Sequence, residues 1–447
     1  MMTSRQRLRL ERLLGLWEHL VDSKVGIIRE VQELPIDDDD PDFFHFLSTS
    51  CNTDRFTSLR NFGNNGGVST DRYVALAKSI GEGIERYCSA VFDYDDLEIA
   101  PFERVEQRAV RPGQFALYRT EQLDAGNLPW QEFRDDVPVA WTEGVSLHTG
   151  VPVLVPAAMV FVPYHYQRSR GDAAIVQPIS TGLAAGCSFA EAALAGLSEC
   201  IERDAFTITW QAHLSRPRID PSTVPVACQQ ILARYREVDL DVKIVDITSD
   251  LGVPTLLTIA VGRSPVSPAI AVAAATDPDP QTALTKSLEE LAHTRKFAKQ
   301  LMDYTPEIVP DPRAGHPAVQ DQKDHLRFYC PQHSREWVEF LWASEEVRPF
   351  DSIQGLAGGT TVELLERVVR RIADARLEAV ACDLTTPDVR ALGLSVVRVV
   401  VPGLHPLFMG HQNRALGGTR LYTVPQRLGC PGLDWFQPDN PYPHPFP

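Results

Sequence analysis

The stretch from Ser180 to Phe206 reads STGLAAGCSFAEAALAGLSECIERDAF, and it decides the fold that we expect. Its glycine-rich start leads into Ser188-Phe189-Ala190-Glu191, which fits the S-x-x-E capping box at the start of helices. Small and apolar residues then continue to Phe206 with few interruptions. The stretch therefore predicts a long helix that carries Glu199, Glu202 and Arg203 in an E-x-x-E-R pattern.

The same E-x-x-E-R pattern occurs at Glu82, Glu85 and Arg86, inside a helix predicted from about Asp71 to Ala90. Spacing i, i+3 places both carboxylates on one helix face, and the arginine at i+4 joins them. One such motif is commonly an ordinary helix salt bridge, contributing about 0.2–0.5 kcal/mol. Here the flanking residues are small or apolar and the pattern occurs twice, which favours two acidic faces that meet.

A third helix is predicted to open at Asp279-Pro280, with aspartate as N-cap and proline at the first helical position, and to run to about Met302. It carries Glu290, His293 and Arg295 on or near one face. Carboxylates that converge at about 4–5 Å repel by roughly 3–4 kcal/mol at an effective dielectric near 20. Such a cluster needs protons or cations, and oxygen ligands suit Mg²⁺.

Arginines beside such a cluster would supply forked donors to phosphate oxygens. The chain contains no G-x-x-x-x-G-K-[ST] run, so these residues indicate a triphosphate site built without a Walker loop. The backbone amides of residues 180–187, just ahead of the acidic helix, are candidates for binding an anion. The run Gly63–Gly67 is predicted to form a turn or a close backbone approach.

Strands and long helices are interleaved without strict βαβ regularity, which predicts an α+β (mixed α/β) fold. Val145–Leu147 and Val151–Val155 flank His148-Thr149-Gly150 and are predicted to form a hairpin. The other predicted elements are strands at Val25–Val31, Phe43–Thr49, Val242–Val245, Thr255–Val261, Ile270–Ala275, Glu378–Asp383 and Val396–Val401, and a helix at Thr361–Ala375.

The composition of the chain argues against several classes of protein. The chain has 447 residues, 44% of them hydrophobic, and a formal net charge of −16. That charge argues against nucleic acid or an anionic membrane as a partner. Eight cysteines without a C-x-x-C pair argue against a zinc ribbon and a disulfide framework and favour a reducing cytoplasm. Charged residues interrupt the N-terminal apolar pattern, so we expect neither a signal peptide nor a membrane span.

The last residues, Pro441-Tyr442-Pro443-His444-Pro445-Phe446-Pro447, alternate prolines with other residues. Alternating prolines stiffen the chain and withhold N–H donors. Without further information, such an end is expected to be a disordered tail.

Four stretches together resemble the YcaO-domain family: Ser180–Phe206, SIGEGIERY at 79–87, SLEELAHTR at 287–295, and VVPGLHPLFMGHQNRALGGTRLY at 400–422. The end PHPFP resembles the P-x-P-x-P terminus of the azoline-forming members, the cyclodehydratases of thiazole/oxazole-modified microcin and related peptide pathways. The resemblance implies a YcaO-like fold, with long helices on β-sheets and an internal pseudo-repeat around a central nucleotide site. It divides the chain into a short segment 1–60 and a catalytic domain 61–447 with the tail 441–447.

By this resemblance, ATP or its magnesium would be contacted by Ser79, Glu82, Glu85, Arg86, Ser180, Glu191, Glu199, Glu202, Arg203, Glu290, His293 and Arg295. The metal ligands among them would be Glu82, Glu85, Glu199 and Glu202. The tail prolines Pro443, Pro445 and Pro447 would act in catalysis by placing the chain end near the active site, where it orients groups or acts as a base. Many members have other residues at three places: a lysine near Val68 and Ser69, an asparagine at Cys187, and a glutamine at His293.

The resemblance also implies a reaction. A Cys, Ser or Thr side chain of a ribosomal precursor peptide attacks the preceding amide carbonyl, the oxyanion takes the γ-phosphoryl of ATP, and loss of phosphate leaves a thiazoline or oxazoline. Only about 60 residues precede the first motif, so we expect a separate E1-like partner that binds the leader peptide. We also expect a homodimer.

Two alternatives stay open. A YcaO enzyme could use the same ATP site with an external nucleophile to form a backbone thioamide or amidine, with a TfuA-like or other partner. A non-catalytic acidic scaffold would use its E-x-x-E-R motifs only as salt bridges.

Overall fold

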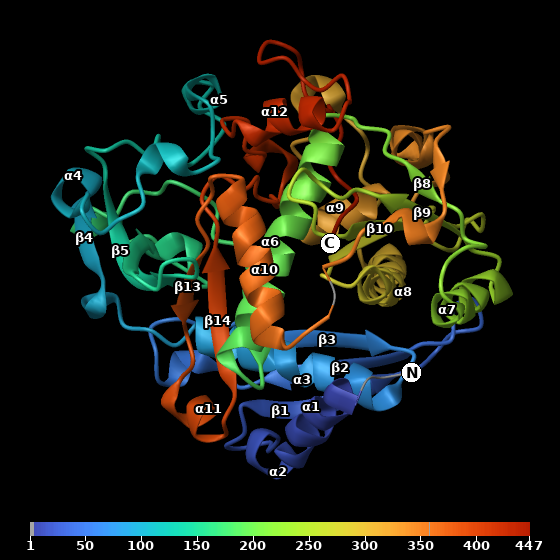
Figure 1. Ribbon diagram of the computed structural model, residues 1–447, viewed down its shortest axis with the longest axis horizontal. Coiled ribbons are helices and arrows are strands. Elements are labelled where there is room, and N and C mark those ends of the chain that lie inside the picture. Colours follow the sequence, from blue (N-terminus) through green and yellow to red (C-terminus); the bar gives the residue numbers. More distant parts are fainter. Residues whose placement is uncertain (1–3, 357) are drawn as a thin grey trace. The chain divides into compact units, whose positions relative to one another are not determined.

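The computed structural model describes residues 4–356 and 358–447 (Figure 1). Its contacts divide the chain into two compact units. The first unit contains the residues up to Pro35, Phe44–Cys200 and Gly358–Gly403; the second contains Ile36–Phe43, residues 201–356 and Leu404–Pro447. Both units combine antiparallel sheets with helices, so the predicted α+β class is confirmed.

A three-stranded antiparallel sheet in the first unit has the order β1 (Ile28–Leu34), β2 (Phe44–Ser50), β3 (Asn64–Ser69). Helix α3 (Arg72–Ser89) packs on it and begins where predicted, because the Asp71 carboxylate accepts hydrogen bonds from the amides of Tyr73 and Val74. Ile80 and Ile84 of α3 are buried with Ile28 in one core.

The prediction of a turn over Gly63–Gly67 is wrong, because residues 64–69 form strand β3 beside β2. The alternative reading, a close backbone approach, is correct. A Cβ atom on Gly67 would lie 2.1 Å from the Ala75 carbonyl oxygen and 2.5 Å from the Ser79 amide nitrogen. Gly67 therefore serves helix packing against the strand rather than a turn.

The second sheet of the first unit has the order β4 (Glu98–Pro101), β5 (Pro138–Ser146), β13 (Val380–Asp383), β14 (Ser395–Val400), β7 (Leu183–Gly186). Strand β6 (Pro152–Pro156) pairs with β5 and forms the predicted hairpin. The helices of this unit, apart from α3 and the start of α6, are α1 (Ser4–Gly15), α2 (Trp17–Leu20), α4 (Phe102–Val105), α5 (Thr120–Asp124), α10 (Thr361–Asp374) and α11 (Pro387–Ala391).

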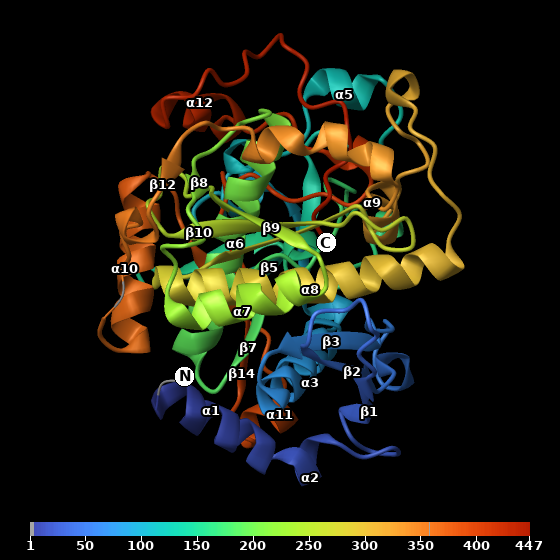
Figure 2. The same ribbon diagram turned by 90° about the vertical axis from the view of Figure 1, so that its right-hand side faces the viewer.

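A five-stranded sheet forms the centre of the second unit, in the order β11 (Ile270–Thr276), β10 (Thr255–Val261), β9 (Asp241–Asp246), β8 (Arg218–Ile219), β12 (Val347–Arg348). Helix α8 (Pro280–Tyr304) packs along β10 and β11, and α7 (Val226–Glu237) lies beside α8 (Figure 2). Asp279 caps α8 as predicted, accepting a hydrogen bond from the Thr282 amide. The unit also contains α9 (Gln322–Phe328) and α12 (Arg420–Arg427).

Helix α6 (Phe189–Gln211) begins in the first unit and ends in the second. Its predicted capping box is half formed. The Glu191 amide donates to the Ser188 hydroxyl oxygen at 3.3 Å, but the Glu191 carboxylate accepts from the Cys187 amide instead of the Ser188 amide.

All eight cysteines are free thiols, as the irregular spacing predicts. Within residues 4–356 and 358–447, no helix combines the length and the apolar character that a bilayer span requires.

The close packing of α3 on β3 makes a testable prediction. Replacing Gly67 with alanine should destabilise the protein by roughly 2–4 kcal/mol, because the added methyl group meets backbone atoms that have little freedom to move. Gly63→Ala is the matched control, since nothing lies within 4 Å of its Cβ position. Urea unfolding measures both variants, and equal stabilities would contradict the packing argument.

Candidate active site

Three glutamates of the first unit are each oriented by a backbone amide. Glu82 on α3 accepts a hydrogen bond from the Gly66 amide at 2.7 Å. Glu85 on α3 accepts from the Ala185 amide of β7 at 2.7 Å. Glu199 on α6 accepts from the Gly182 amide at 3.0 Å. The acidic faces of α3 and α6 are thus held on the same short strand segment, residues 182–185.

These bonds correct the prediction for the glycine-rich run. Three of its amides are not open to a phosphate group, because those of Gly182, Ala185 and Cys187 already donate to Glu199, Glu85 and Glu191. Ser180 is partly exposed, and its carbonyl oxygen accepts from the Leu183 amide at 3.0 Å. The run positions carboxylates, and in this way it contributes to a cation site rather than to an anion site.

Burial, with the nearby Glu82 and Glu199 carboxylates, raises the pKa of Glu85 to about 8 against the opposing effects of the Ala185 amide and Arg86. A carboxyl group in this state holds a proton near neutral pH unless a cation replaces the proton. Arg86 pairs with Glu82 at 3.2 Å and provides only part of that compensation.

Arg398 of β14 is a residue that the sequence analysis missed. Its side chain is 4% exposed, and burial lowers its pKa to about 10. Its Nη2 donates to the Ile179 carbonyl oxygen at 2.7 Å, whereas Nε and Nη1 have no hydrogen-bond partner. Its electrostatic neighbours include Glu199 and Arg86. The available signal was an arginine inside the apolar strand sequence Ser395–Val400.

The donor set of the first unit therefore fits a magnesium–triphosphate group. The Glu82 and Glu199 carboxylates act electrostatically on Glu85, which would otherwise be protonated, and this suits a hard divalent cation with oxygen ligands. The unpaired N–H groups of Arg398 suit an anion, because a buried guanidinium without acceptors is costly to leave unsatisfied.

Two predicted nucleotide contacts have other partners. Ser79 is fully buried, and its hydroxyl group donates to the Leu76 carbonyl oxygen at 2.9 Å inside α3. Glu191 accepts from Arg9 of α1 at 2.7 Å with one carboxylate oxygen and from the Cys187 amide at 3.0 Å with the other. These contacts favour a packing role for Ser79 and a tethering role for Glu191.

In the second unit, Glu202 is 9% exposed and accepts from the Thr276 amide, at the end of β11, at 3.2 Å. It pairs with Arg203 at 3.4 Å. Arg203 donates to the Pro447 carbonyl oxygen at 3.1 Å, and its guanidinium lies 4.5 Å from the centre of the Phe446 ring. Glu202 is thus oriented by a backbone amide, as Glu82, Glu85 and Glu199 are, and Arg203 links helix α6 to the C-terminal segment.

Helix α8 buries a different acid from the predicted one. Glu290 is exposed, whereas the neighbouring Glu289 is 6% exposed and His293 is partly buried. Glu289 and His293 are four residues apart and share a helix face. The sequence motif contains both glutamates, and only packing decides which one turns inward.

Arg295 does not point to an open phosphate position. Its guanidinium is buried and pairs with Asp40 at 2.8 Å and Asp39 at 3.4 Å. From its place beside Glu290 on one helix, Arg295 was expected to contact the nucleotide. In the structure its guanidinium pairs instead with carboxylates of the acidic loop before β2. The geometry favours a structural role for this residue.

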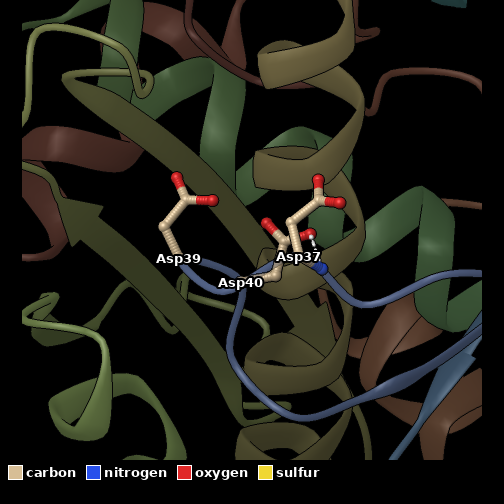
Figure 3. Close-up of side chains that lie close together, drawn as sticks. All are labelled: Asp37, Asp39 and Asp40. Carbon is tan, nitrogen blue, oxygen red and sulfur yellow. Dashed lines mark hydrogen bonds between the residues drawn. The ribbon is translucent and has the colours of Figure 1, made fainter.

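That loop brings Asp37, Asp39 and Asp40 together (Figure 3). The cluster resembles a metal site, but Lys296 pairs with Asp40 at 2.6 Å and Lys299 pairs with Asp37 at 3.1 Å and with Asp39. Burial acts to raise the pKa of Asp40, yet the bond from Lys296 and the charges of Lys299 and Arg295 outweigh burial and hold the pKa below its usual value. The cations of α8 balance the loop, so it needs no metal ion.

The C-terminal segment is ordered, contrary to the disordered tail expected by default. Pro443, His444, Pro445 and Phe446 are all buried. Phe446 packs against Phe206 of α6, with ring centres 4.3 Å apart. The tail is therefore part of the second unit's core.

Comparisons with known proteins identify the family and the fold. The sequence model of the YcaO family, described as a YcaO cyclodehydratase that binds ATP and Mg²⁺, matches residues 66–405. An uncharacterized protein of Methanothermobacter thermautotrophicus is 27% identical over 366 residues, which cover 78% of this chain and 85% of that protein. An uncharacterized protein from the tfuA 3′ region of Rhizobium leguminosarum bv. trifolii is 26% identical over 279 residues, 60% of this chain and 61% of that protein.

Two solved structures share the fold. A heterocyclase in complex with substrate and cofactor has a TM-score of 0.78 at 22% identity, and the match covers 98% of this chain but only 57% of the heterocyclase. The YcaO protein of Methanopyrus kandleri bound with AMPPCP and Mg²⁺ has a TM-score of 0.62 at 22% identity, covering 90% of this chain and 91% of that one.

The raised pKa of Glu85 predicts how stability depends on pH. Between the ordinary value of 4.5 and about 8, the folded protein keeps a proton that the unfolded chain has released, so the free energy of unfolding falls as pH rises through this window. Glu85→Gln removes the effect and should be the more stable protein near pH 8, by roughly 3 kcal/mol.

Urea unfolding of both proteins between about pH 5 and pH 9 measures the difference. Adding Mg²⁺ and a non-hydrolysable ATP analogue should flatten the decline in the parent protein, because a cation then replaces the proton. Parallel stability curves for the two proteins would contradict the burial of an uncompensated carboxylate.

Proposed function

This chain belongs to the YcaO family of ATP- and Mg²⁺-binding cyclodehydratases, and from that premise we propose that it closes azoline rings in a ribosomal precursor peptide. A Cys, Ser or Thr side chain of the peptide adds to the preceding carbonyl carbon, the carbonyl oxygen takes the γ-phosphoryl group of ATP, and that oxygen leaves with phosphate as the ring C=N bond forms. Phosphorylation is needed because an amide oxygen is by itself a poor leaving group.

The observation that carries the proposal is the set of glutamates oriented by backbone amides beside an arginine with unsatisfied N–H groups. Glu82, Glu85 and Glu199 would hold magnesium, and Arg86 and Arg398 would hold phosphate oxygens. Fixed carboxylates and guanidinium groups need little reorganisation when charge moves during phosphoryl transfer, which is how such sites lower the barrier.

We propose that α6 and α8 of the second unit supply nucleotide contacts of their own. Glu202 and Arg203 follow Glu199 by three and four residues, so they share its helix face. We assign Glu202 to the metal and Arg203 to phosphate. On α8, we propose that Glu289 and His293 contact the nucleotide and that Glu290 lies at the edge of the nucleotide site. Arg295 would stabilise the fold around it through its ion pair with Asp40.

For the tail, we propose that Pro443, Pro445 and Pro447 act by position. They present Phe446 and the Pro447 carbonyl oxygen to Arg203. An arginine held between a ring and a carbonyl oxygen keeps its remaining N–H groups in a fixed direction, which suits a phosphate contact.

We also propose the partners and the setting. The chain spans 57% of the heterocyclase that it matches in structure. We propose that an E1-like protein delivers the leader peptide of the substrate. We propose that residues 61–447 form the catalytic domain and that the protein assembles as a homodimer. Eight free thiols support a reducing cytoplasm.

The relative from the tfuA 3′ region supports one alternative, a backbone thioamide or amidine formed with a TfuA-like partner. The buried proline tail favours ring formation over it. The scaffold alternative has no support, since family membership makes the chain an ATP-dependent enzyme.

Replacing Glu199 with glutamine should lower magnesium-dependent ATP hydrolysis by roughly 100-fold or more, because the metal loses a charged ligand. Glu237→Gln, at an exposed position on α7, is the matched control and should hydrolyse ATP at the parent rate. Released phosphate is measured, and circular dichroism reports folding. Undiminished hydrolysis in the Glu199 variant would exclude the assigned cation site.

Deleting residues 443–447 should abolish ring formation, read by mass spectrometry as loss of one water per ring. Because the deletion also removes buried Phe446, a milder variant, Pro447→Gly, should slow ring formation by roughly tenfold while the melting temperature changes by only a few degrees. Full ring formation by the deletion variant would favour the thioamide or amidine alternative.

A further inference from the structure

The C-terminal segment, residues 441–447, has few backbone hydrogen-bond donors of its own. Proline has no N–H group, so only Tyr442, His444 and Phe446 have backbone donors among residues 441–447. The carbonyl groups of the segment remain, and burial requires that they find donors. The receiving surface must therefore supply hydrogen-bond donors from side chains.

Helix α6 supplies two of these donors. The Trp210 indole N–H donates to the Tyr442 carbonyl oxygen at 3.1 Å, and Arg203 donates to the Pro447 carbonyl oxygen at 3.1 Å. Phe206 packs on Phe446 between them. Positions 203, 206 and 210 lie on one helix face, so α6 forms one wall of the groove.

Helix α9 and its C-cap supply the other two donors. The Tyr329 hydroxyl group donates to the Pro443 carbonyl oxygen at 2.5 Å. His325 Nδ1 lies 2.8 Å from the His444 carbonyl oxygen, while its Nε2 accepts from the Gly410 amide at 3.0 Å. Because Nε2 is an acceptor, Nδ1 must carry the proton and donate to His444.

The His444 ring makes the complementary set of bonds. Its Nε2 lies 2.7 Å from the Phe408 carbonyl oxygen and donates to it, and its Nδ1 accepts from the Phe446 amide at 3.3 Å. The two imidazole rings stack with centres 3.9 Å apart. Burial lowers the pKa of His325 to about 4, so a neutral ring with one donor and one acceptor is the form present near pH 7.

Proline alternation alone does not fix the register of the tail. Prolines recur every second residue from 441 to 447, so a slip by two residues would restore the same pattern of prolines. The residues between them differ, and among Tyr442, His444 and Phe446 only histidine has one ring nitrogen to donate to Phe408 and another to accept from the Phe446 amide.

We infer that His325, supported by Tyr329, is a positioning residue that sets the register of the terminal segment and thereby places Phe446 and Pro447 against Arg203. The effect of His325 on catalysis rests on the proposed function. Its effect on the register of the terminal segment rests only on the geometry of the groove. Its two parts can be tested separately.

The register is tested in the full chain by hydrogen–deuterium exchange. His325→Phe removes both hydrogen bonds and should accelerate exchange at the His444 and Phe446 amides at least tenfold. His325→Asn keeps a donor near the Nδ1 position and should restore most of the protection. His333→Phe, at an exposed position, is the control. Unchanged exchange in His325→Phe would overturn the inference.

The catalytic consequence is tested with a synthetic cysteine-containing peptide, Mg²⁺ and ATP. His325→Phe should lower kcat for ring formation about tenfold while KM for ATP stays within about twofold, and His325→Asn should recover most of the rate. A parent enzyme that forms rings at the same rate as His325→Phe would overturn the positioning role and leave the proposed function standing. The E1-like partner that we propose is included in this assay. A parent enzyme that forms no rings with it would count against the proposed function, and the exchange experiment would still decide the register.

Discussion

A backbone amide that donates to a glutamate is the interaction on which this structure depends. Among the glutamates of the candidate site it recurs from Gly66 to Glu82, from Ala185 to Glu85, from Cys187 to Glu191, from Gly182 to Glu199 and from Thr276 to Glu202. Each bond fixes the direction of a carboxylate that would otherwise rotate freely and stabilises its charged form. At Gly182 a glycine is needed because strand β14 and helix α6 both approach closely: a Cβ atom would lie 2.2 Å from the Val399 carbonyl oxygen and 2.7 Å from the Cys200 sulfur atom.

The helices and strands were predictable because their signals are local. Asp71 and Asp279 cap helices where the sequence indicates, and the β5–β6 hairpin turns where predicted. The failures come from partners distant in sequence. Strand β3 exists because β2 lies beside it, and Arg295 is engaged because a loop more than 250 residues earlier carries Asp39 and Asp40.

The same difference between local signals and distant partners applies to the residues of the candidate site. The spacing of Glu82, Glu85 and Arg86, and of Glu199, Glu202 and Arg203, predicts two acidic helix faces, and the structure places both motifs on long helices, α3 and α6. No spacing could indicate that Glu289 rather than Glu290 turns inward, or that Arg398 enters a strand with two unpaired nitrogen atoms. The tail looked disordered because its composition lacks donors, whereas α6 and α9 supply those donors in three dimensions.

The account is tested most directly by locating the metal. Crystals grown with Mn²⁺ and a non-hydrolysable ATP analogue, measured at the manganese absorption edge, should give anomalous peaks within coordination distance of the Glu82, Glu85 or Glu199 carboxylates. Peaks at the loop of Asp37, Asp39 and Asp40, with none at these glutamates, would contradict it.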